Sequence, residues 1–182
     1  MATSPNKTTQ YTSEQFVESC GAVLFDLSSP QGKKVCLIQY HAKNEWLLAK
    51  GRRNCGESRH EAALRELREE TGYSAHLHPV TMSTRAPPRD EQGHMPDKPH
   101  PYTDLTEPFM VTMRQRGGEG TNDVKIIWWY IAALDEGVPG AVEEAEEEFS
   151  AQFFPLEEAV QKLSFQNDRT VLQKAIALVD TC

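Results

Sequence analysis

The chain has 182 residues, a length that fits one domain of ordinary size. Hydrophobic residues make up 38% and charged residues 25%, which is typical of a globular protein and excludes a disordered chain. The net charge is −8, whereas a protein that binds nucleic acid by neutralising phosphates carries positive charge, so we expect no extended nucleic-acid binding.

Residues 1–12 are polar and are predicted to be a flexible tail ahead of a single domain over 13–182. The N-terminus lacks the apolar core of a secretory signal, and no stretch approaches the roughly 20 apolar residues that cross a membrane. Four cysteines without any Cys-x-x-Cys pair favour free thiols in a reducing compartment: Cys20, Cys36, Cys55 and Cys182. We therefore expect an intracellular, cytoplasmic protein without membrane contacts.

Two short apolar runs, 20–27 and 33–40, flank a turn-forming Ser-Ser-Pro-Gln-Gly stretch and predict a β-hairpin. A helix is predicted within 51–72, and residues 73–82 are predicted to form one strand. Residues 83–108 hold six of the eleven prolines and are predicted to be a long insertion loop. Because loops of this length in compact domains are usually functional or disordered, this segment is a candidate for substrate recognition.

Two further strands are predicted at 108–116 and 124–134. The second is apolar on both faces, so it should lie centrally in a covered sheet. Its aromatic cluster is predicted to belong to the core rather than to a base-stacking surface: Trp128, Trp129 and Tyr130.

The C-terminal part predicts a last short strand at 149–154 and helices at 156–163 and 167–179. No internal repeat or second domain is visible in the sequence. Together these elements predict an α/β fold in which helices flank one mixed sheet.

The stretch 51–73, GRRNCGESRHEAALRELREETGY, contains clear signals for both ends of its helix. Ser58 and Glu61 have the S-x-x-E spacing of a capping box, so the helix should begin just after Ser58. Gly72 suits a left-handed cap at the other end. Between these ends the helix is predicted to turn an apolar stripe toward the sheet: Ala62, Ala63, Leu64 and Leu67.

Three glutamates of this helix, Glu66, Glu69 and Glu70, fall within an arc of about 100°. A solvated helix face is the simplest interpretation, but carboxylates gathered on one face repel one another. Hard divalent cations favour such an array, and Mg²⁺ typically shares its ligands with water and substrate phosphates. Arg65 lies four residues from both Glu61 and Glu69, so it can neutralise part of the array.

The stretch resembles the Nudix box, because the residues that this motif fixes are present at its spacing: Gly51, Glu57, Arg65, Glu66, Leu67, Glu69, Glu70 and Gly72. Tyr73 stands where that family usually has an aliphatic residue. The order of the predicted elements also resembles the Nudix α/β/α sandwich. The resemblance implies an enzyme that hydrolyses a nucleoside diphosphate linked to another group, X. Its substrate would be a small phosphorylated molecule.

The resemblance also implies roles for individual residues. Glu66, Glu69 and Glu70, with the carbonyl of Gly51, resemble the ligands of Mg²⁺ or Mn²⁺, and Glu57 resembles a residue near the metals or bracing the loop. Arg65 resembles the arginine that pairs with the carboxylates. Bound metal ions would neutralise the pyrophosphate and activate a water molecule, so that an acidic protein can hold an acidic substrate.

The run 143–148 contains five glutamates and no base, which accounts for most of the net charge. A solvated acidic loop is one interpretation. The other is a further metal ligand or general base supplied from across the site, as in many members of the resembled family. Counting back from Phe153 selects Glu147 for that role, with Glu148 and Glu144 as alternatives.

Three residues outside the box are candidate substrate contacts. Lys50 directly precedes the box glycine and could contact a phosphate. Arg85 and Tyr102, from the proline-rich segment, could reach a phosphate or a base. An ordinary surface role is the alternative for each.

Three short segments resemble the asymmetrical diadenosine tetraphosphate hydrolases: the opening strand 19–25, Trp46 ahead of Ala49-Lys50-Gly51, and the tail 155–175. Ala49 departs from the proline usual in that branch. The resemblance implies cleavage of a dinucleoside polyphosphate, diadenosine tetraphosphate, to ATP and AMP. The proline-rich segment leaves diphosphoinositol polyphosphates, capped RNA and nucleotide sugars open. A non-catalytic module that binds a nucleotide or a protein is the alternative of another class, and the intact box disfavours it.

Overall fold

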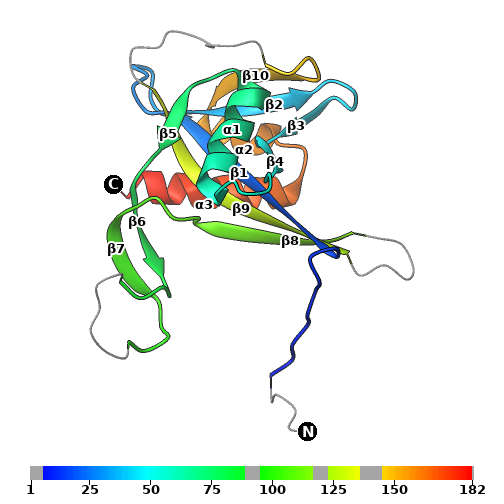
Figure 1. Ribbon diagram of the computed structural model, residues 1–182. Coiled ribbons are helices and arrows are strands. Elements are labelled where there is room, and N and C mark those ends of the chain that lie inside the picture. Colours follow the sequence, from blue (N-terminus) through cyan, green and yellow to red (C-terminus); the bar gives the residue numbers. More distant parts are fainter. Residues whose placement is uncertain (1–5, 89–94, 117–122, 136–144, 182) are drawn as a thin grey trace, which may run out of the picture.

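The computed structural model describes residues 6–88, 95–116, 123–135 and 145–181 (Figure 1). Its elements follow one another in this order: β1 (Phe16–Asp26), β2 (Lys34–Tyr40), β3 (Glu45–Leu47), β4 (Lys50–Arg52), α1 (Arg59–Thr71), β5 (Ala75–Leu77), β6 (Val80–Thr84), β7 (His100–Leu105), β8 (Met110–Arg116), β9 (Asp123–Leu134), β10 (Phe149–Pro155), α2 (Leu156–Lys162) and α3 (Gln166–Val179).

The main sheet is mixed, as predicted. Its strand order is β10-β2-β1-β9-β5, with β3 paired to β2, β4 to β1 and β8 to β9. β1 and β9 run parallel from the Phe16–Val124 pair to the Phe25–Ala133 pair, and the other pairs are antiparallel. The predicted hairpin is confirmed as β1 and β2. The central position predicted for 124–134 is also confirmed, because β9 has β1 on one edge and β5 and β8 on the other.

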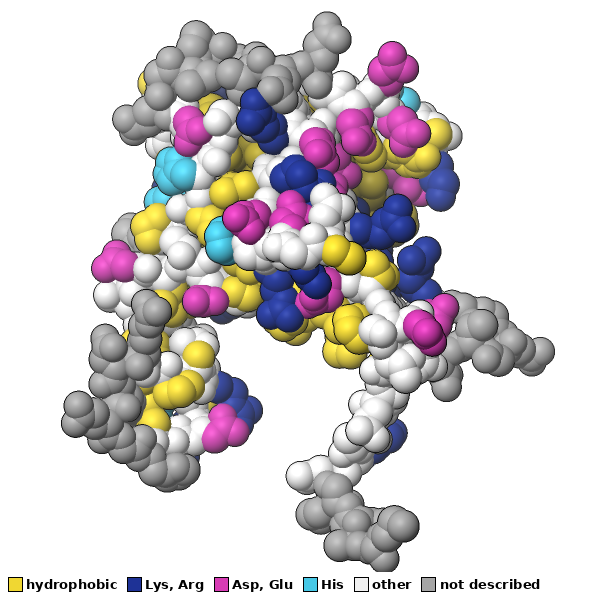
Figure 2. All heavy atoms as spheres, in the orientation of Figure 1, with side chains coloured by type: hydrophobic (Ala, Val, Ile, Leu, Met, Phe, Trp, Pro, Cys, Tyr) yellow, Lys and Arg dark blue, Asp and Glu magenta, His cyan; other side chains and the backbone are white. Residues whose placement is uncertain are grey.

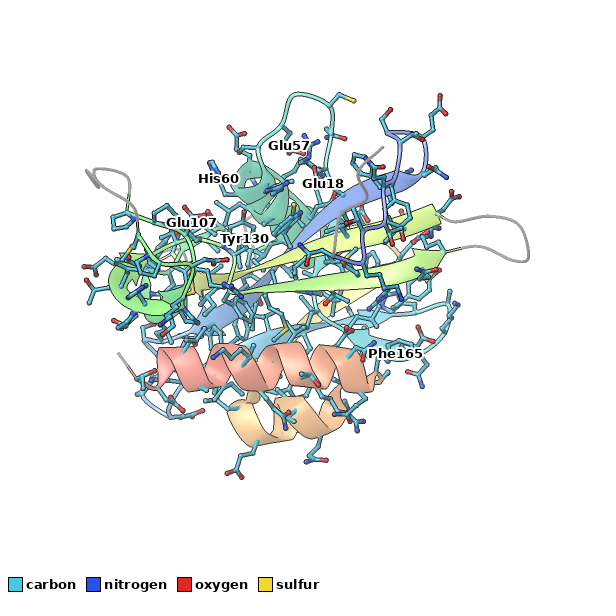
Figure 3. The ribbon with its side chains drawn as sticks, turned by 90° about the horizontal axis from the view of Figure 1, so that it is seen from below. Glu18, Glu57, His60, Glu107, Tyr130 and Phe165 are labelled. Atoms are coloured by element: carbon cyan, nitrogen blue, oxygen red, sulfur yellow. The ribbon has the colours of Figure 1, made fainter. Side chains whose placement is uncertain are left out.

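Helices cover both faces of this sheet, which makes the fold the predicted α/β/α sandwich. Figure 3 shows α1 on one side of the strands and the pair α2 and α3 on the other. Alternate residues of β9 point to the two layers: Trp129 belongs to the apolar core beneath α2 and α3, and Tyr130 to the smaller core beneath α1. Trp129 is fully buried, whereas Trp128 is half-buried and carries the Arg59 guanidinium 4.0 Å above its ring.

The ends of α1 lie where the sequence predicts them. The Ser58 hydroxyl accepts a hydrogen bond from the Glu61 N–H, and the Glu61 carboxylate accepts one from the Ser58 N–H at 2.8 Å. Gly72 closes the helix with φ 73°, a left-handed conformation that glycine adopts without steric cost. Ala63 and Leu67 are buried against the sheet, and Glu70, seven residues after Ala63, is buried on nearly the same face of α1.

The single strand predicted at 73–82 is wrong. β5 pairs with β9 in the main sheet, whereas β6 pairs with β7 in a separate two-stranded sheet that projects from the body in Figure 1. Pro79 lies between β5 and β6 and has no N–H to continue the ladder.

The prediction that 83–108 is entirely loop is therefore also wrong, because β7 lies within it. The sequence pattern did not predict this strand, because prolines are rare in strands. Pro101 is tolerated because β7 pairs only with β6 among the described strands and so has a free edge. The described tail residues 6–12 form no helix or strand.

Three cysteines are free, as predicted: Cys20, Cys36 and Cys55. Cys182 lies outside the described residues. Every helix in the described part of the chain is too short or too polar to cross a bilayer.

Candidate active site

The site begins where α1 packs against the short strand β4. β4 pairs with β1, placing Gly51 opposite Cys20 and Lys50 opposite Gly21. The Glu66 carboxylate lies directly against Gly51, in the space that any side chain at position 51 would fill. The Lys50 N–H donates a 2.7 Å hydrogen bond to the Glu70 carboxylate. Thus the chain that leads into α1 is joined to two glutamates of the helix.

Arg65 connects the carboxylates into one network. Its Nε and Nη2 bind the two oxygens of Glu57 at 2.7 and 3.0 Å. Its Nη1 binds Glu66 at 2.7 Å and Glu69 at 2.8 Å. The second Nη2 hydrogen bond, 2.9 Å long, goes to the carbonyl of Arg52. These five contacts match the five N–H donors of a guanidinium, so Arg65 holds the array in one geometry.

Burial sets the electrostatics of the site. Glu70 is only 8% exposed. This burial raises the pKa of the Glu70 carboxyl to about 8, although the charge of Lys50 opposes the shift. Burial also raises the pKa of Glu66, against the opposing effect of Arg65. Glu57 differs, because its hydrogen bonds from Arg65 lower its pKa. Glu66 and Glu70 are therefore short of positive charge, which an additional cation can supply.

The donor chemistry of this array fits Mg²⁺ or Mn²⁺, because carboxylate and carbonyl oxygens are the ligands those ions prefer. Among the described residues, no three His, Cys, Asp or Glu side chains converge closely enough to enclose an ion. In this structure Glu66 and Glu69 are turned to Arg65 instead. An open array still fits Mg²⁺, which keeps several water ligands and binds through few carboxylates.

Within the described part of the acidic run, Glu146 contacts α1. Glu146 donates its N–H to the Glu69 carbonyl at 3.0 Å, and its charge raises the pKa of both Glu66 and Glu70. Glu147 is exposed, and its carbonyl lies 3.2 Å from Nδ1 of His41. Glu144 lies outside the described residues.

The insertion residues lie apart from this array. Arg85 is exposed and paired with Asp97, through Nε at 2.8 Å. Tyr102 donates its hydroxyl to the Met95 sulfur at 3.6 Å and lines a pocket of about 740 Å³ beside Pro87 and Pro88. Tyr102 belongs to β7 and Arg85 directly follows β6, and the sheet formed by these two strands projects away from α1 in Figure 1. Their role as substrate contacts stays a prediction.

Sequence reasoning missed a second carboxylate centre, Glu18 of β1. Its oxygens bind Arg53 at 3.0 Å, Arg59 at 2.7 Å and the Trp128 indole N–H at 2.9 Å. Figure 3 shows Glu18 on the same side of the sheet as Glu57 at the start of α1. Figure 2 shows acidic and basic side chains intermixed over this face. The signal in the sequence was a charged residue next to the apolar run of β1.

The fold and the site define a class of proteins, the α/β/α sandwiches whose acidic helix faces a glycine in a short strand. A family model described as the NUDIX domain matches residues 19–175. The chain belongs to the Nudix family and is a pyrophosphohydrolase. Members of this family act on small phosphorylated substrates and generally use divalent metal ions.

Several solved structures share the fold of this chain, and their sequence identities of 12–18% indicate the fold alone. A C. elegans Ap4A hydrolase binary complex has 18% identity and a TM-score of 0.60, covering 91% of this chain and 99% of that one. The Nudix domain of Shewanella oneidensis NrtR, complexed with ADP ribose, has 18% identity and a TM-score of 0.54, covering 92% of each chain. The E. coli dihydroneopterin triphosphate pyrophosphohydrolase has 12% identity and a TM-score of 0.53, covering 86% and 92%. No curated protein matches the chain.

Two glycine substitutions should separate function from stability. In Gly51→Ala the new methyl group displaces the Glu66 carboxylate, the flexible end of a side chain, so the fold should survive. We expect metal affinity to fall about 10–100-fold. In Gly21→Ala the methyl group meets the Ala49 carbonyl at 2.6 Å and the Trp129 ring at 2.7 Å, so stability should fall by about 1–3 kcal/mol. Mn²⁺ titration and thermal unfolding measure the two effects. Normal metal affinity in Gly51→Ala would contradict the placement of Glu66.

Proposed function

We propose that this chain is a Mg²⁺- or Mn²⁺-dependent hydrolase of dinucleoside polyphosphates, with cleavage of diadenosine tetraphosphate to ATP and AMP as the first candidate. The observation that carries the metal-dependent chemistry is a pair of carboxylates, the half-buried Glu66 against Gly51 and the buried Glu70 on the Lys50 N–H. The short segments that resemble the asymmetrical diadenosine tetraphosphate hydrolases carry the choice of substrate. An Ap4A hydrolase is also among the structures that share the fold.

In this proposal Glu66, Glu69, Glu70 and the Gly51 carbonyl hold the metal ions. Bound ions neutralise the pyrophosphate and lower the pKa of a water ligand. Arg65 orients Glu66 and Glu69 by the hydrogen bonds described above, so it has a positioning role. A carboxylate oxygen of Glu147, or of its neighbour Glu146, accepts the proton of the attacking water.

Other residues of the proposal act on the substrate. The ammonium group of Lys50 binds a phosphate, while its N–H holds Glu70. Arg85 and Tyr102 contact the part of the substrate that extends over the insertion, where Tyr102 lines the pocket of about 740 Å³. The free cysteines agree with a cytoplasmic location.

A substrate panel tests this proposal. With Mg²⁺ present, we expect diadenosine tetraphosphate to be converted to ATP and AMP, resolved by ion-exchange chromatography. ADP ribose, capped RNA and a diphosphoinositol polyphosphate are the alternative substrates in the panel. The variants Arg85→Gln and Tyr102→Ala are assayed in parallel, and KM for the preferred substrate should rise in both. Phosphate release from the diphosphoinositol, with no cleavage of dinucleoside polyphosphates, would replace the proposed substrate. Binding without turnover of any compound would indicate a non-catalytic module.

A further inference from the structure

Three basic residues have side chains on the α3 side of the main sheet. Arg114 of β8 is directly opposite Lys125 of β9, and Lys125 lies four residues before Trp129 on the same face. Lys50 begins on that face too, since a methyl group on Gly21 would touch both the Lys50 Cβ and the Trp129 ring at 2.7 Å. We call Lys50, Arg114 and Lys125 the basic cluster.

One acidic side chain points into this cluster from the first turn of α3. Asp168 is 1% exposed, and its Oδ1 lies 3.5 Å from Nη2 of Arg114. Its Oδ2 has no hydrogen-bond partner in the described part of the chain. Burial raises the pKa of Asp168, while Lys50 and Arg114 lower it. Burying the Asp168 carboxylate costs desolvation free energy, and the nearby cations offset that cost.

The charges of the cluster are not balanced. Burial lowers the pKa of Lys125, and the charges of Lys50, Arg114 and Arg116 lower it further. The charge of Glu66, from the opposite layer, raises the pKa of Lys125. The cations gathered around one carboxylate repel one another, so an anion that joined them would stabilise the cluster.

The cluster is also continuous with the candidate metal site. Lys50 donates its N–H to Glu70 at 2.7 Å, and the Glu66 carboxylate lies against the next residue, Gly51. An anion bound by the cluster would therefore lie beside the metal-ligating carboxylates, where the next phosphate of an extended substrate would be.

We propose that Lys50, Arg114 and Lys125 bind a phosphate of the substrate beyond the pyrophosphate unit held by the metal ions, and that Asp168 is the counter-ion that holds the cluster together until this phosphate arrives. The inference rests on the proposed function and narrows it to substrates rich in phosphate. Those substrates are a chain of three or more phosphates or a group X that itself carries phosphate.

Binding measurements with simple probes test the cluster. With Mg²⁺ present, calorimetry would compare inorganic pyrophosphate, inorganic tripolyphosphate and inositol hexakisphosphate. We expect Arg114→Gln and Lys125→Gln each to weaken tripolyphosphate binding about 10-fold or more, the loss of one charge-assisted hydrogen bond, and to weaken pyrophosphate binding far less. Lys174→Gln, an exposed lysine of α3, is the matched control. Equal tripolyphosphate affinity in the wild type and both variants would overturn the inference.

The comparison between probes separates this inference from the proposed function. If Mg²⁺ does not promote pyrophosphate binding, the proposed metal-dependent function fails, whatever the cluster does. If pyrophosphate binds normally but tripolyphosphate gains nothing from the cluster, only the inference fails. A cluster-dependent gain for inositol hexakisphosphate alone supports a phosphorylated group X, and one for tripolyphosphate alone supports a phosphate chain.

Asp168→Asn tests the counter-ion role by thermal unfolding. Without its carboxylate the basic cluster is unbalanced, so we expect the Tm to fall without ligand and the rise on adding tripolyphosphate to exceed that of the wild type. A residue that only packs would lower the Tm without enlarging the rise. An unchanged or smaller rise would therefore reject the counter-ion role.

Discussion

Glu70→Gln should abolish Mg²⁺-dependent turnover and leave the protein folded. The loss should reach about 10³-fold or more, or about 4 kcal/mol of transition-state stabilisation, because an amide is a poor ligand for a hard cation. The fold should tolerate glutamine, because burial raises the pKa of this carboxyl to about 8 and a neutral group suits its surroundings. Glu69→Gln should lose activity to a similar extent, although its side chain is 44% exposed.

Initial rates at saturating Mg²⁺ and thermal unfolding in EDTA provide the two readouts. Glu157→Gln, the same substitution at an exposed position of α2, is the control and should behave as the wild type. Turnover within tenfold of the wild type in both α1 variants would refute the assignment of these glutamates as metal ligands. A large loss of stability would instead show that the hydrogen bond from the Lys50 N–H to Glu70 is structural.

Arg65→Ala should reduce both stability and metal affinity. Removing the guanidinium leaves Glu57, Glu66 and Glu69 without their shared partner, and breaking a buried ion pair costs about 3–5 kcal/mol. Since the Arg65 side chain is 27% exposed, solvent should reduce this loss in unfolding free energy to about 2–3 kcal/mol. Arg65→Lys should recover only part of it, because an ammonium cannot reproduce the bidentate pairing with Glu57.

Urea denaturation in EDTA and in Mg²⁺ measures this effect. Mg²⁺ should restore more stability to Arg65→Ala than to the wild type, because it supplies positive charge to the same carboxylates. Arg52→Ala removes an exposed arginine of β4 and is the control, since Arg65 uses only the backbone carbonyl of that residue. If Arg65→Ala is as stable as Arg52→Ala, the network does not hold the site.

The candidate site could be predicted where its determinants are local in the chain. The capping box, the Gly72 cap and the shared face of Glu66, Glu69 and Glu70 depend on helix geometry over a few turns. Arg65 could be predicted to neutralise carboxylates for the same reason, because i,i+4 residues are neighbours on a helix.

The partners of those residues could not be predicted, because they come from distant strands. The neighbours of Glu18 are Arg53, Arg59 and Trp128, brought together by the parallel pairing of β1 with β9 and by the turn into α1. Glu146 reaches the site through a backbone hydrogen bond to α1 that no sequence pattern encodes.

The sequence by itself determined the family, the helix that carries the carboxylates and the mixed sheet, because periodicity, caps and the box spacing are properties of adjacent residues. Only the tertiary structure decided how 73–108 divides between two sheets and how Lys50, Arg114, Lys125 and Asp168 come together. Strand register and helix packing determine those contacts, and both depend on residues far apart in the chain.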